Sequence, residues 1–189
     1  HPEDIAEQAK DWSYQEEIQY LIGCQDRNRF IRNLTISLNK NTLVLYQLVD
    51  KHGKLLYDMI KEKSNGRQVF FVHGGVETED REEIRSIMEK ENDAIVVASY
   101  GTFSTGINIR NLHNIIFASP SKSRIRNLQS IGRGLRQSDG KEQATLYDIA
   151  DDMRVGNHMN STLRHFVERV KIYTNEKFPF KIYKIGLKK

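Results

Sequence analysis

The chain has 189 residues, of which 38% are hydrophobic and 29% charged, so its composition allows a buried core and excludes a disordered chain. A single cysteine, Cys24, excludes an internal disulfide and a cysteine-rich zinc site, and no apolar run approaches the roughly 20 residues that a membrane span needs. The net charge is only +4, but basic residues gather at 122–141 and again after 169, which favours a polyanionic partner or, at the end of the chain, solubilising charge.

The compartment expected for a chain with one cysteine and no visible signal peptide is a reducing cytoplasm. We expect no membrane partner. Because the sequence opens on His1 rather than methionine, we also expect it to be a piece of a longer protein.

Residues 1–40 are predicted to be helical and to form a linker or docking arm. A proline followed by two acidic residues suits a first helical turn. Ser13 and Glu16 have the spacing of a capping box before a second helix, and Gly23 is a natural stop. Asp26 is expected to cap a third helix.

Residues 41–155 alternate between short apolar runs of β type and amphipathic stretches. Strands are predicted at 42–46, 68–72, 94–98, 114–118 and 144–149. The runs are continuously apolar, which is typical of strands covered on both faces, and hence of a parallel sheet with crossover helices. We therefore predict an α/β fold: a doubly wound parallel sheet with helices on both faces.

Two of the crossover helices carry definite expectations. The first is predicted at about 51–63, with its inward side formed by Leu55, Leu56, Met59 and Ile60. The second follows the next strand and is expected to be capped by Thr78.

Residues 156–189 are predicted to form a helical extension with a basic tail. The amphipathic helix covers 156–177 and ends at the Phe178-Pro179-Phe180 sequence. The apolar residues at 180–185 indicate either a short edge strand or a loose tail.

Polar and glycine-rich loops follow the predicted strands at 47–53, 73–75, 99–108 and 119–123. In doubly wound sheets ligands bind at the carboxyl ends of the strands, so these loops are candidates for a binding site. The third loop combines hydroxyls, glycines and an amide, a composition suited to phosphates.

A pair of arginines, Arg133 and Arg136, lies in the run Gln-Ser-Ile-Gly-Arg-Gly-Leu-Arg at 129–136. On a helix these positions share a face, and two guanidiniums suit a ligand with several oxygens such as a phosphate chain. The alternative is a solvated basic turn of helix.

Taken in order, the Ser-Thr-Gly-Ile-Asn-Ile loop at 104–109, a strand, and the arginine-bearing run at 129–136 resemble motifs V and VI of superfamily 2 helicases. Residues 43–53 resemble motif IV of the same family. The resemblance covers about residues 40–150 and implies a RecA-like second motor domain. Over its full length, extensions included, the chain looks close to phage recombination helicases of this superfamily, which implies a role in DNA recombination and repair.

The resemblance implies a role for each matching residue at the nucleotide. Arg133 and Arg136 stand where relatives contact the phosphates of ATP as arginine fingers, and Gln129 opens the same motif. Gly106 and Asn108 match positions near the nucleotide. Many relatives have an aspartate in place of Asn108.

Nucleic-acid contacts are implied at the loops that follow the strands. They would come from Gln47, His73, Gly74, Ser99, Thr102, Thr105 and Gly106. The loop after Ser99 is a residue longer than in DEAD-box relatives, so Thr102 and Ser104 are both candidates for one role.

No Gly-x-x-x-x-Gly-Lys-Ser/Thr run and no Asp-Glu-x-His or Asp-Glu-x-Asp run occurs in the sequence, and the histidines show no metal spacing. ATP and Mg²⁺ are therefore expected to be shared with a first RecA-like domain of the same protein. We expect the chain to be the second motor domain of an ATP-dependent helicase that unwinds or branch-migrates DNA, with RNA–DNA hybrid as an alternative substrate. Two other interpretations stay open: a non-catalytic nucleic-acid-binding or annealing module, and a motor subunit of a restriction or remodelling complex.

Overall fold

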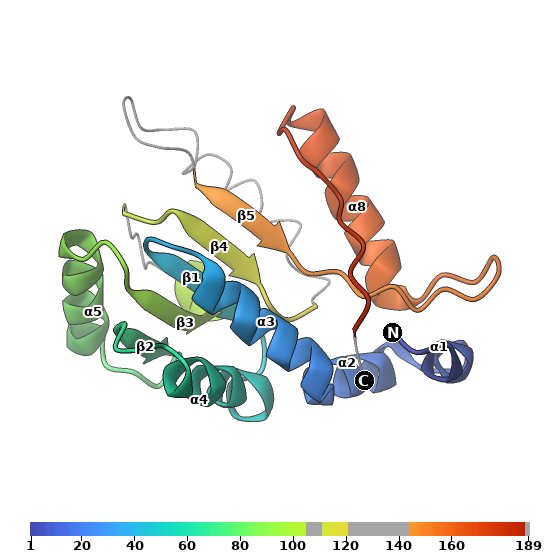
Figure 1. Cartoon of the computed structure of the whole chain (residues 1–189), viewed down its shortest axis with the longest axis horizontal. Helices are drawn as coiled ribbons and strands as arrows, with labels where there is room; N and C mark the ends of the chain where they lie inside the picture. Colours follow the sequence, from blue (N-terminus) through green and yellow to red (C-terminus); the bar gives the residue numbers. More distant parts are fainter. Residues whose placement is uncertain (105–110, 121–143, 188–189) are drawn as a thin grey trace.

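The computed structural model describes residues 1–104, 111–120 and 144–187. Its centre is a parallel sheet in the order β2-β3-β1-β4-β5 (Figure 1). The strands are β1 (Thr42–Tyr46), β2 (Val69–Val72), β3 (Ile95–Ser99), β4 (Asn114–Phe117) and β5 (Thr145–Asp148). The strand predictions and the parallel arrangement are confirmed, with boundaries shifted by one residue at most ends.

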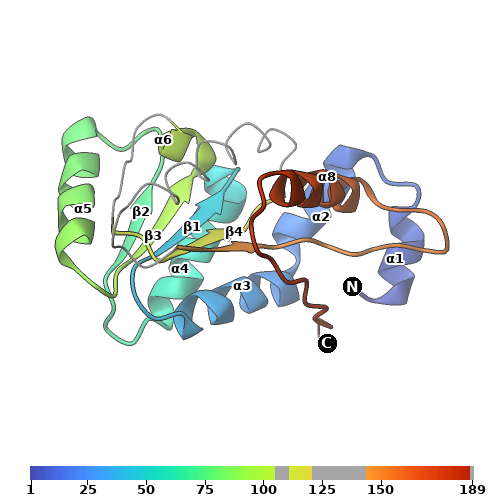
Figure 2. The same ribbon diagram turned by 90° about the horizontal axis from the view of Figure 1, so that it is seen from above.

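Helices cover both faces of this sheet (Figure 2). One face packs against α3 (Gln25–Ser37) and α4 (Lys54–Glu62), through residues such as Ile31, Leu56 and Ile60. The other packs against α5 (Thr78–Lys90), α6 (Tyr100–Ser104) and α8 (Ser161–Asn175). The predicted doubly wound α/β architecture is therefore confirmed.

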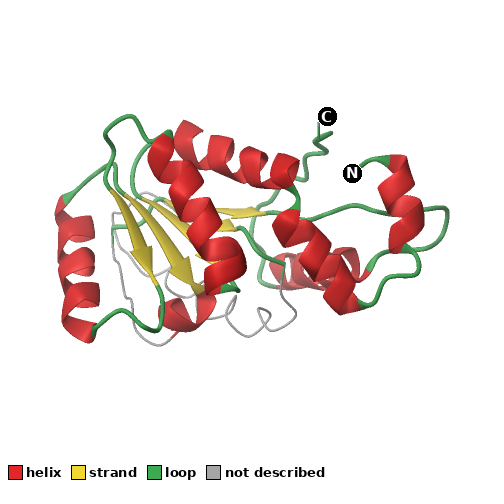
Figure 3. Cartoon of the chain, turned by 90° about the horizontal axis from the view of Figure 1, so that it is seen from below, coloured by secondary structure: helices red, strands yellow, loops and turns green. Residues whose placement is uncertain are grey.

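Two further helices lie beyond the sheet, α1 (Glu3–Ala9) and α2 (Tyr14–Gly23) (Figure 3). The capping box is present at the start of α2: the Glu16 backbone N–H donates to Ser13 Oγ, and the Ser13 N–H donates to Glu16 Oε2. The expected cap at Asp26 is wrong. Cys24 is the N-cap of α3, and Asp26 lies in the first turn, where its carboxylate pairs with Arg29.

The helix predicted at 51–63 begins instead as a π-helical turn, η1 (Val49–Gly53). There the N–H groups of His52 and Gly53 both donate to the carbonyl of Leu48, at 3.1 and 2.9 Å. A π turn inserts an extra residue and rotates the following helix. Leu56 and Ile60 are consequently buried, but Leu55, expected on the inward side, is 42% exposed.

Gly53 lies against the ring of Tyr46, and a Cβ atom added at this position would overlap with carbons of that ring. The ring cannot retreat, because it is fully buried and its hydroxyl donates to the Val72 carbonyl at 3.0 Å. We expect Gly53→Ala to lower the free energy of unfolding by about 1–3 kcal/mol, measured by urea denaturation. Gly23→Ala is the control, because nothing lies within 4 Å of a Cβ atom added there; equal unfolding midpoints for the two variants would contradict this close packing.

The helix α5 starts at Thr78, but the expected cap at this residue is wrong. Glu77 takes the N-cap position, and its carbonyl accepts the N–H of Arg81 at 3.1 Å. The Thr78 hydroxyl accepts a hydrogen bond from the Arg81 side chain instead.

The last helix starts later than predicted, at Ser161 rather than 156. Residues 155–158 form an antiparallel bridge, with Gly156 at φ 55°, so the chain is not yet helical there. The N-terminus of α8 is satisfied by Glu17 of α2, whose buried carboxylate accepts the N–H groups of Ser161 and Thr162 at 2.9 and 2.8 Å. Residues 178–187, the C-terminal tail, form no strand. Of the two predicted alternatives, an edge strand and a loose tail, the structure therefore has the loose tail.

The segments on either side of the sheet are tied to it. Ile31 of α3 is fully buried against one face, and Tyr173 of α8 packs into the core on the other. The division of the chain at residues 40 and 155 stays a prediction, and these contacts indicate that α3 and α8 form part of the cover of the sheet.

Candidate functional site

Three of the predicted site residues meet at the carboxyl edge of the sheet. In the register of the strands, Tyr46 of β1 lies opposite Ser99 of β3, and Val72 of β2 lies opposite Ala98. The residues that follow β1 and β2 therefore flank the end of β3. Gln47, Ser99 and His73 accordingly occupy neighbouring positions along one edge, as predicted for a binding site in a doubly wound sheet.

The hydroxyls of Ser99 and Thr102 are directed at each other. Their oxygens are 2.6 Å apart, and the Thr102 N–H donates to Ser99 Oγ at 3.3 Å. The two residues are only 8% and 3% exposed. In this arrangement they hold the turn that leads from β3 into α6, while Gly101 between them is exposed.

The loop after β2 is shaped by His73. Its Nδ1 accepts the N–H of Gly75 at 3.1 Å, so in the neutral ring the proton lies on Nε2. The ring packs on Phe71, with centroids 5.2 Å apart. Gly74 is exposed and has nothing within 4 Å of a Cβ position, so its backbone is open to an approaching ligand.

A chain of hydrogen bonds that sequence reasoning missed supports Gln47. The Gln47 N–H donates to Ser119 Oγ at 3.1 Å, and Ser119 Oγ lies 2.6 Å from His52 Nδ1. His52 Nε2 is 3.0 Å from Asn28 Oδ1, and the amide of Asn28 donates to the Ile22 carbonyl at 2.8 Å.

These partners fix which group donates in each of these hydrogen bonds. Because the Asn28 amide nitrogen is a donor to a carbonyl, its Oδ1 must accept, so His52 carries its proton on Nε2 and accepts from Ser119 at Nδ1. His52 is fully buried. This series of hydrogen bonds joins the end of α2 to the loop after β1. Only the tertiary structure brings these groups together.

A buried ion pair secures the adjoining end of β4. The Nη1 of Arg27 donates to the Ala118 carbonyl at 2.7 Å, and its Nε lies 2.9 Å from Asp151 Oδ1. The hydroxyl of Tyr100 donates to the Ser119 carbonyl at 3.3 Å. The strand end next to the candidate site is thus held from both faces of the sheet.

The remaining predicted site residues lie outside the described part of the chain. They are Thr105, Gly106, Asn108, Gln129, Arg133 and Arg136.

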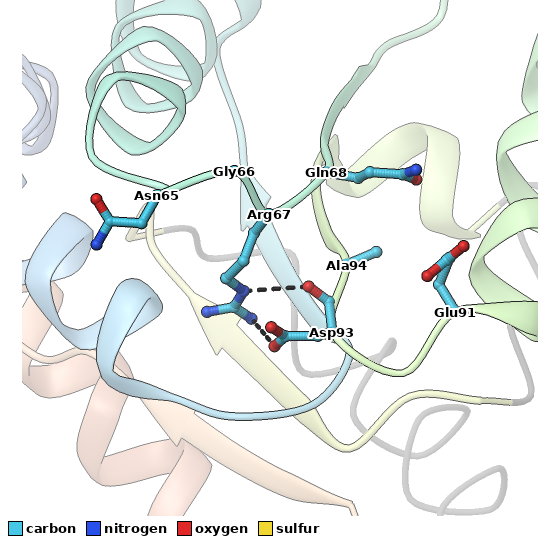
Figure 4. A pocket seen from close by; sticks show the side chains of 7 residues that line it. All are labelled: Asn65, Gly66, Arg67, Gln68, Glu91, Asp93 and Ala94. Carbon is cyan, nitrogen blue, oxygen red and sulfur yellow. Dashed lines mark hydrogen bonds and ion pairs between the residues drawn. The ribbon is translucent and has the colours of Figure 1, made fainter.

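A pocket of about 360 Å³ lies at the opposite, amino edge of the sheet (Figure 4). Its central side chain, Arg67, pairs with Asp93 at 3.0 Å and donates to the carbonyls of Leu38 and Lys40. Arg67 therefore joins the end of α3 to the start of β3. We interpret this pocket as a structural junction rather than a ligand site.

Within the described ranges, no three His, Cys, Asp or Glu side chains are grouped so as to hold a metal ion. The same residues include no helix with the length and apolar character required to cross a bilayer.

The parallel sheet, with helices on both faces and polar loops at its carboxyl edge, defines an α/β domain of the RecA-like class. The chain belongs to the helicase conserved C-terminal domain family, whose model matches residues 26–138, more than half of the chain.

Among individual proteins, the chain is similar to the ATP-dependent DNA helicase UvsW of Enterobacteria phage T4, with 36% identity over 200 residues that cover 99% of this chain and 39% of that protein. It is also similar to the putative ATP-dependent helicase IRC3 of Saccharomyces cerevisiae, with 29% identity over 117 residues, 62% of this chain and 16% of that protein. The chain therefore spans about two fifths of the first relative and less of the second.

Solved structures show the same fold. The crystal structure of T4 UvsW superimposes with a TM-score of 0.78 and 37% identity, covering 93% of this chain and 37% of that one. Domain 2 of the DEAD-box helicase Mss116p, bound to an RNA duplex, matches with a TM-score of 0.54 and 16% identity, covering 67% of this chain and 50% of that one. The predicted RecA-like fold is confirmed.

Proposed function

We propose that this chain is the second motor domain of an ATP-dependent helicase that unwinds or branch-migrates DNA in recombination and repair. The family match to residues 26–138 carries the proposal, because it spans both the loop at 99–108 and the arginines of the 129–136 run. The likeness to a phage DNA helicase supports DNA as the substrate and the cytoplasm of an infected bacterium as the place of action.

In this proposal the chain supplies part of an ATP site that a first motor domain completes. Arg133 and Arg136 would stabilise the charge of the transferring phosphoryl group, with Gln129, Gly106 and Asn108 near the nucleotide. The described residues offer no acidic cluster suited to Mg²⁺, so the metal ion would be held by the rest of the protein.

The edge of the sheet would contact the nucleic-acid backbone. Gln47, His73 and Gly74 lie beside the end of β3, and the sequence continues from there to Thr105 and Gly106. Because the hydroxyls of Ser99 and Thr102 are engaged with each other, we propose that they act by holding this turn in place. Contacts of this kind read phosphates rather than bases, so binding would be tolerant of sequence and sensitive to salt.

The isolated chain is expected to show no ATP hydrolysis above background, because its sequence contains no phosphate-binding lysine motif and no acidic pair for magnesium. Phosphate release should be measured for the isolated chain and for the full-length protein, each with and without DNA. We expect DNA-stimulated turnover only in the full-length protein. Turnover by the chain alone that Arg136→Ala abolishes would contradict the shared site.

A further inference from the structure

The C-terminal tail, residues 178–187, leaves α8 in a fixed direction. The Phe178 N–H donates to the Tyr173 carbonyl at 2.9 Å and the Lys177 N–H to the Thr174 carbonyl at 3.1 Å, while Lys177 has a φ of 57°. This is a Schellman motif, which closes the helix and turns the chain back. The tail then runs back toward the side of the molecule on which the N-terminus lies (Figures 1 and 2).

Beyond this turn the tail exposes an unusual set of side chains. Every residue from 179 to 186 is exposed. Four large apolar residues occur within six positions, with exposed fractions of 44, 59, 76 and 57% for Phe180, Ile182, Tyr183 and Ile185. Exposed apolar residues normally occur singly on a protein surface, so this cluster marks a surface that contacts a partner.

The charge of the tail limits what that partner can be. Lys181 and Lys184 alternate with the two aromatic rings, and the sequence from Lys177 to the end contains no acidic residue. The pKa of Asp152 is lowered chiefly by its hydrogen bond from Arg154 and in part by Lys184, so the tail approaches this nearby exposed pair. An apolar protein interface is depleted in lysine at its centre, whereas aromatic rings among lysines suit a polyanion with stacked rings of its own.

We propose that the tail binds single-stranded nucleic acid, with Phe180 and Tyr183 stacking on bases and Lys181 and Lys184 contacting phosphates. This surface is separate from the carboxyl edge of the sheet. It would add a second contact to the nucleic-acid strand on which the motor domain acts. The inference rests on the proposed function only in taking nucleic acid as the substrate. It requires neither ATP nor the arginines of the 129–136 run.

The test is fluorescence anisotropy of a labelled oligothymidylate of about 20 nucleotides, titrated without ATP at several salt concentrations. Phe180→Ala/Tyr183→Ala should weaken binding roughly tenfold or more with an unchanged salt slope, because stacking is lost and charge is kept. The same variant should lose less affinity for a blunt duplex, whose bases are already stacked.

The lysines are tested by Lys181→Ala/Lys184→Ala, which should reduce the salt slope by about 1.4, or about 0.7 for each phosphate contact with a single strand. The matched control is Lys63→Ala/Lys90→Ala, which removes the same charge from exposed positions near the ends of α4 and α5 and should leave affinity within about twofold.

Four results would overturn the inference. Wild-type binding by both tail variants would remove the tail from the interface while leaving the proposed function intact. Equal losses of affinity in the tail lysine variant and in the control would show that the effect comes from the net charge of the protein and not from the position of the tail lysines. A lower thermal midpoint of the tail variants with unchanged binding would show that the tail packs against another part of the polypeptide. Failure of the wild-type chain to bind the oligonucleotide at all would overturn the nucleic-acid role in the proposed function as well.

Discussion

Replacing Arg136 by alanine in the full-length protein is expected to lower ATP hydrolysis by roughly 10³-fold or more and to leave DNA binding in place. The reason is that an arginine finger stabilises charge that develops on the transferring phosphoryl group, while the DNA backbone is contacted by other residues. The readouts are steady-state phosphate release at saturating ATP and DNA, and DNA affinity in the absence of ATP.

Arg85→Ala is the matched control for this experiment. Arg85 is a surface arginine of α5 whose guanidinium pairs with Glu82 and Glu89, so its loss removes one positive charge at a residue that has no proposed role in the ATP site. Its ATPase rate should stay close to that of the unmodified protein. If Arg136→Ala hydrolysed ATP as fast as Arg85→Ala, the assignment of an arginine finger would be wrong.

The same variants separate the proposed function from a non-catalytic binding module. In a module that only grips phosphates, Arg133→Ala and Arg136→Ala would weaken DNA binding and reduce its salt dependence by about one phosphate contact each. Such a module would have no ATPase activity for the substitutions to lower. The two functions therefore predict different losses for the same substitutions: a loss of ATP turnover for the helicase and a loss of DNA affinity for the binding module.

The strands of this protein could be predicted because their sequence signal is local and strong. β1 and β3 each contain four consecutive apolar residues and are buried at every position, and the capping box before α2 is formed by residues three apart. The exceptions have local causes that the pattern does not encode. The π turn at Val49–Gly53 rotates α4, and a bridge between Val155 and His158 delays the start of α8.

The candidate site was predictable at the level of its edge but not of its contacts. Loops after parallel strands must meet, so Gln47, His73 and Ser99 were placed correctly beside one another. The support of Gln47 through Ser119 and His52 joins residues 72 and 67 positions apart, and no spacing rule identifies such pairs. The mutual hydrogen bond of Ser99 and Thr102 likewise needed the three-dimensional geometry of the turn.

Loss of the Asp148 carboxylate at the end of β5 should strongly reduce stability. Its carboxylate accepts hydrogen bonds from Arg169 Nε at 2.7 Å, Arg169 Nη2 at 2.9 Å and the Tyr173 hydroxyl at 2.6 Å. Burial disfavours the charged guanidinium, but the Asp148 carboxylate outweighs it and the pKa of Arg169 is raised. Burial, reinforced by Asp148, also raises the pKa of Tyr173, which therefore remains a donor. This cluster fixes α8, and with it the C-terminal tail, on the sheet.

Asp148→Asn should therefore lower the free energy of unfolding by about 3–5 kcal/mol, because it leaves the Arg169 charge buried without its partner. For a chain of this length that corresponds to a fall in thermal midpoint of roughly 6–20 °C. Asp152→Asn is the matched control, since the Asp152–Arg154 pair has both side chains 46% exposed and should contribute no more than about 1 kcal/mol.

A double variant identifies the cause of the loss. Asp148→Asn/Arg169→Met removes the unpaired charge, while the amide oxygen introduced at position 148 can still accept from the Tyr173 hydroxyl, so it should be more stable than Asp148→Asn alone. If the double variant were the less stable of the two, the cost would come from lost packing of the long Arg169 side chain. The buried charge would then not be the reason that α8 depends on Asp148, and the attachment of the tail would have to be sought in the apolar contacts of Tyr173 and Phe178 instead.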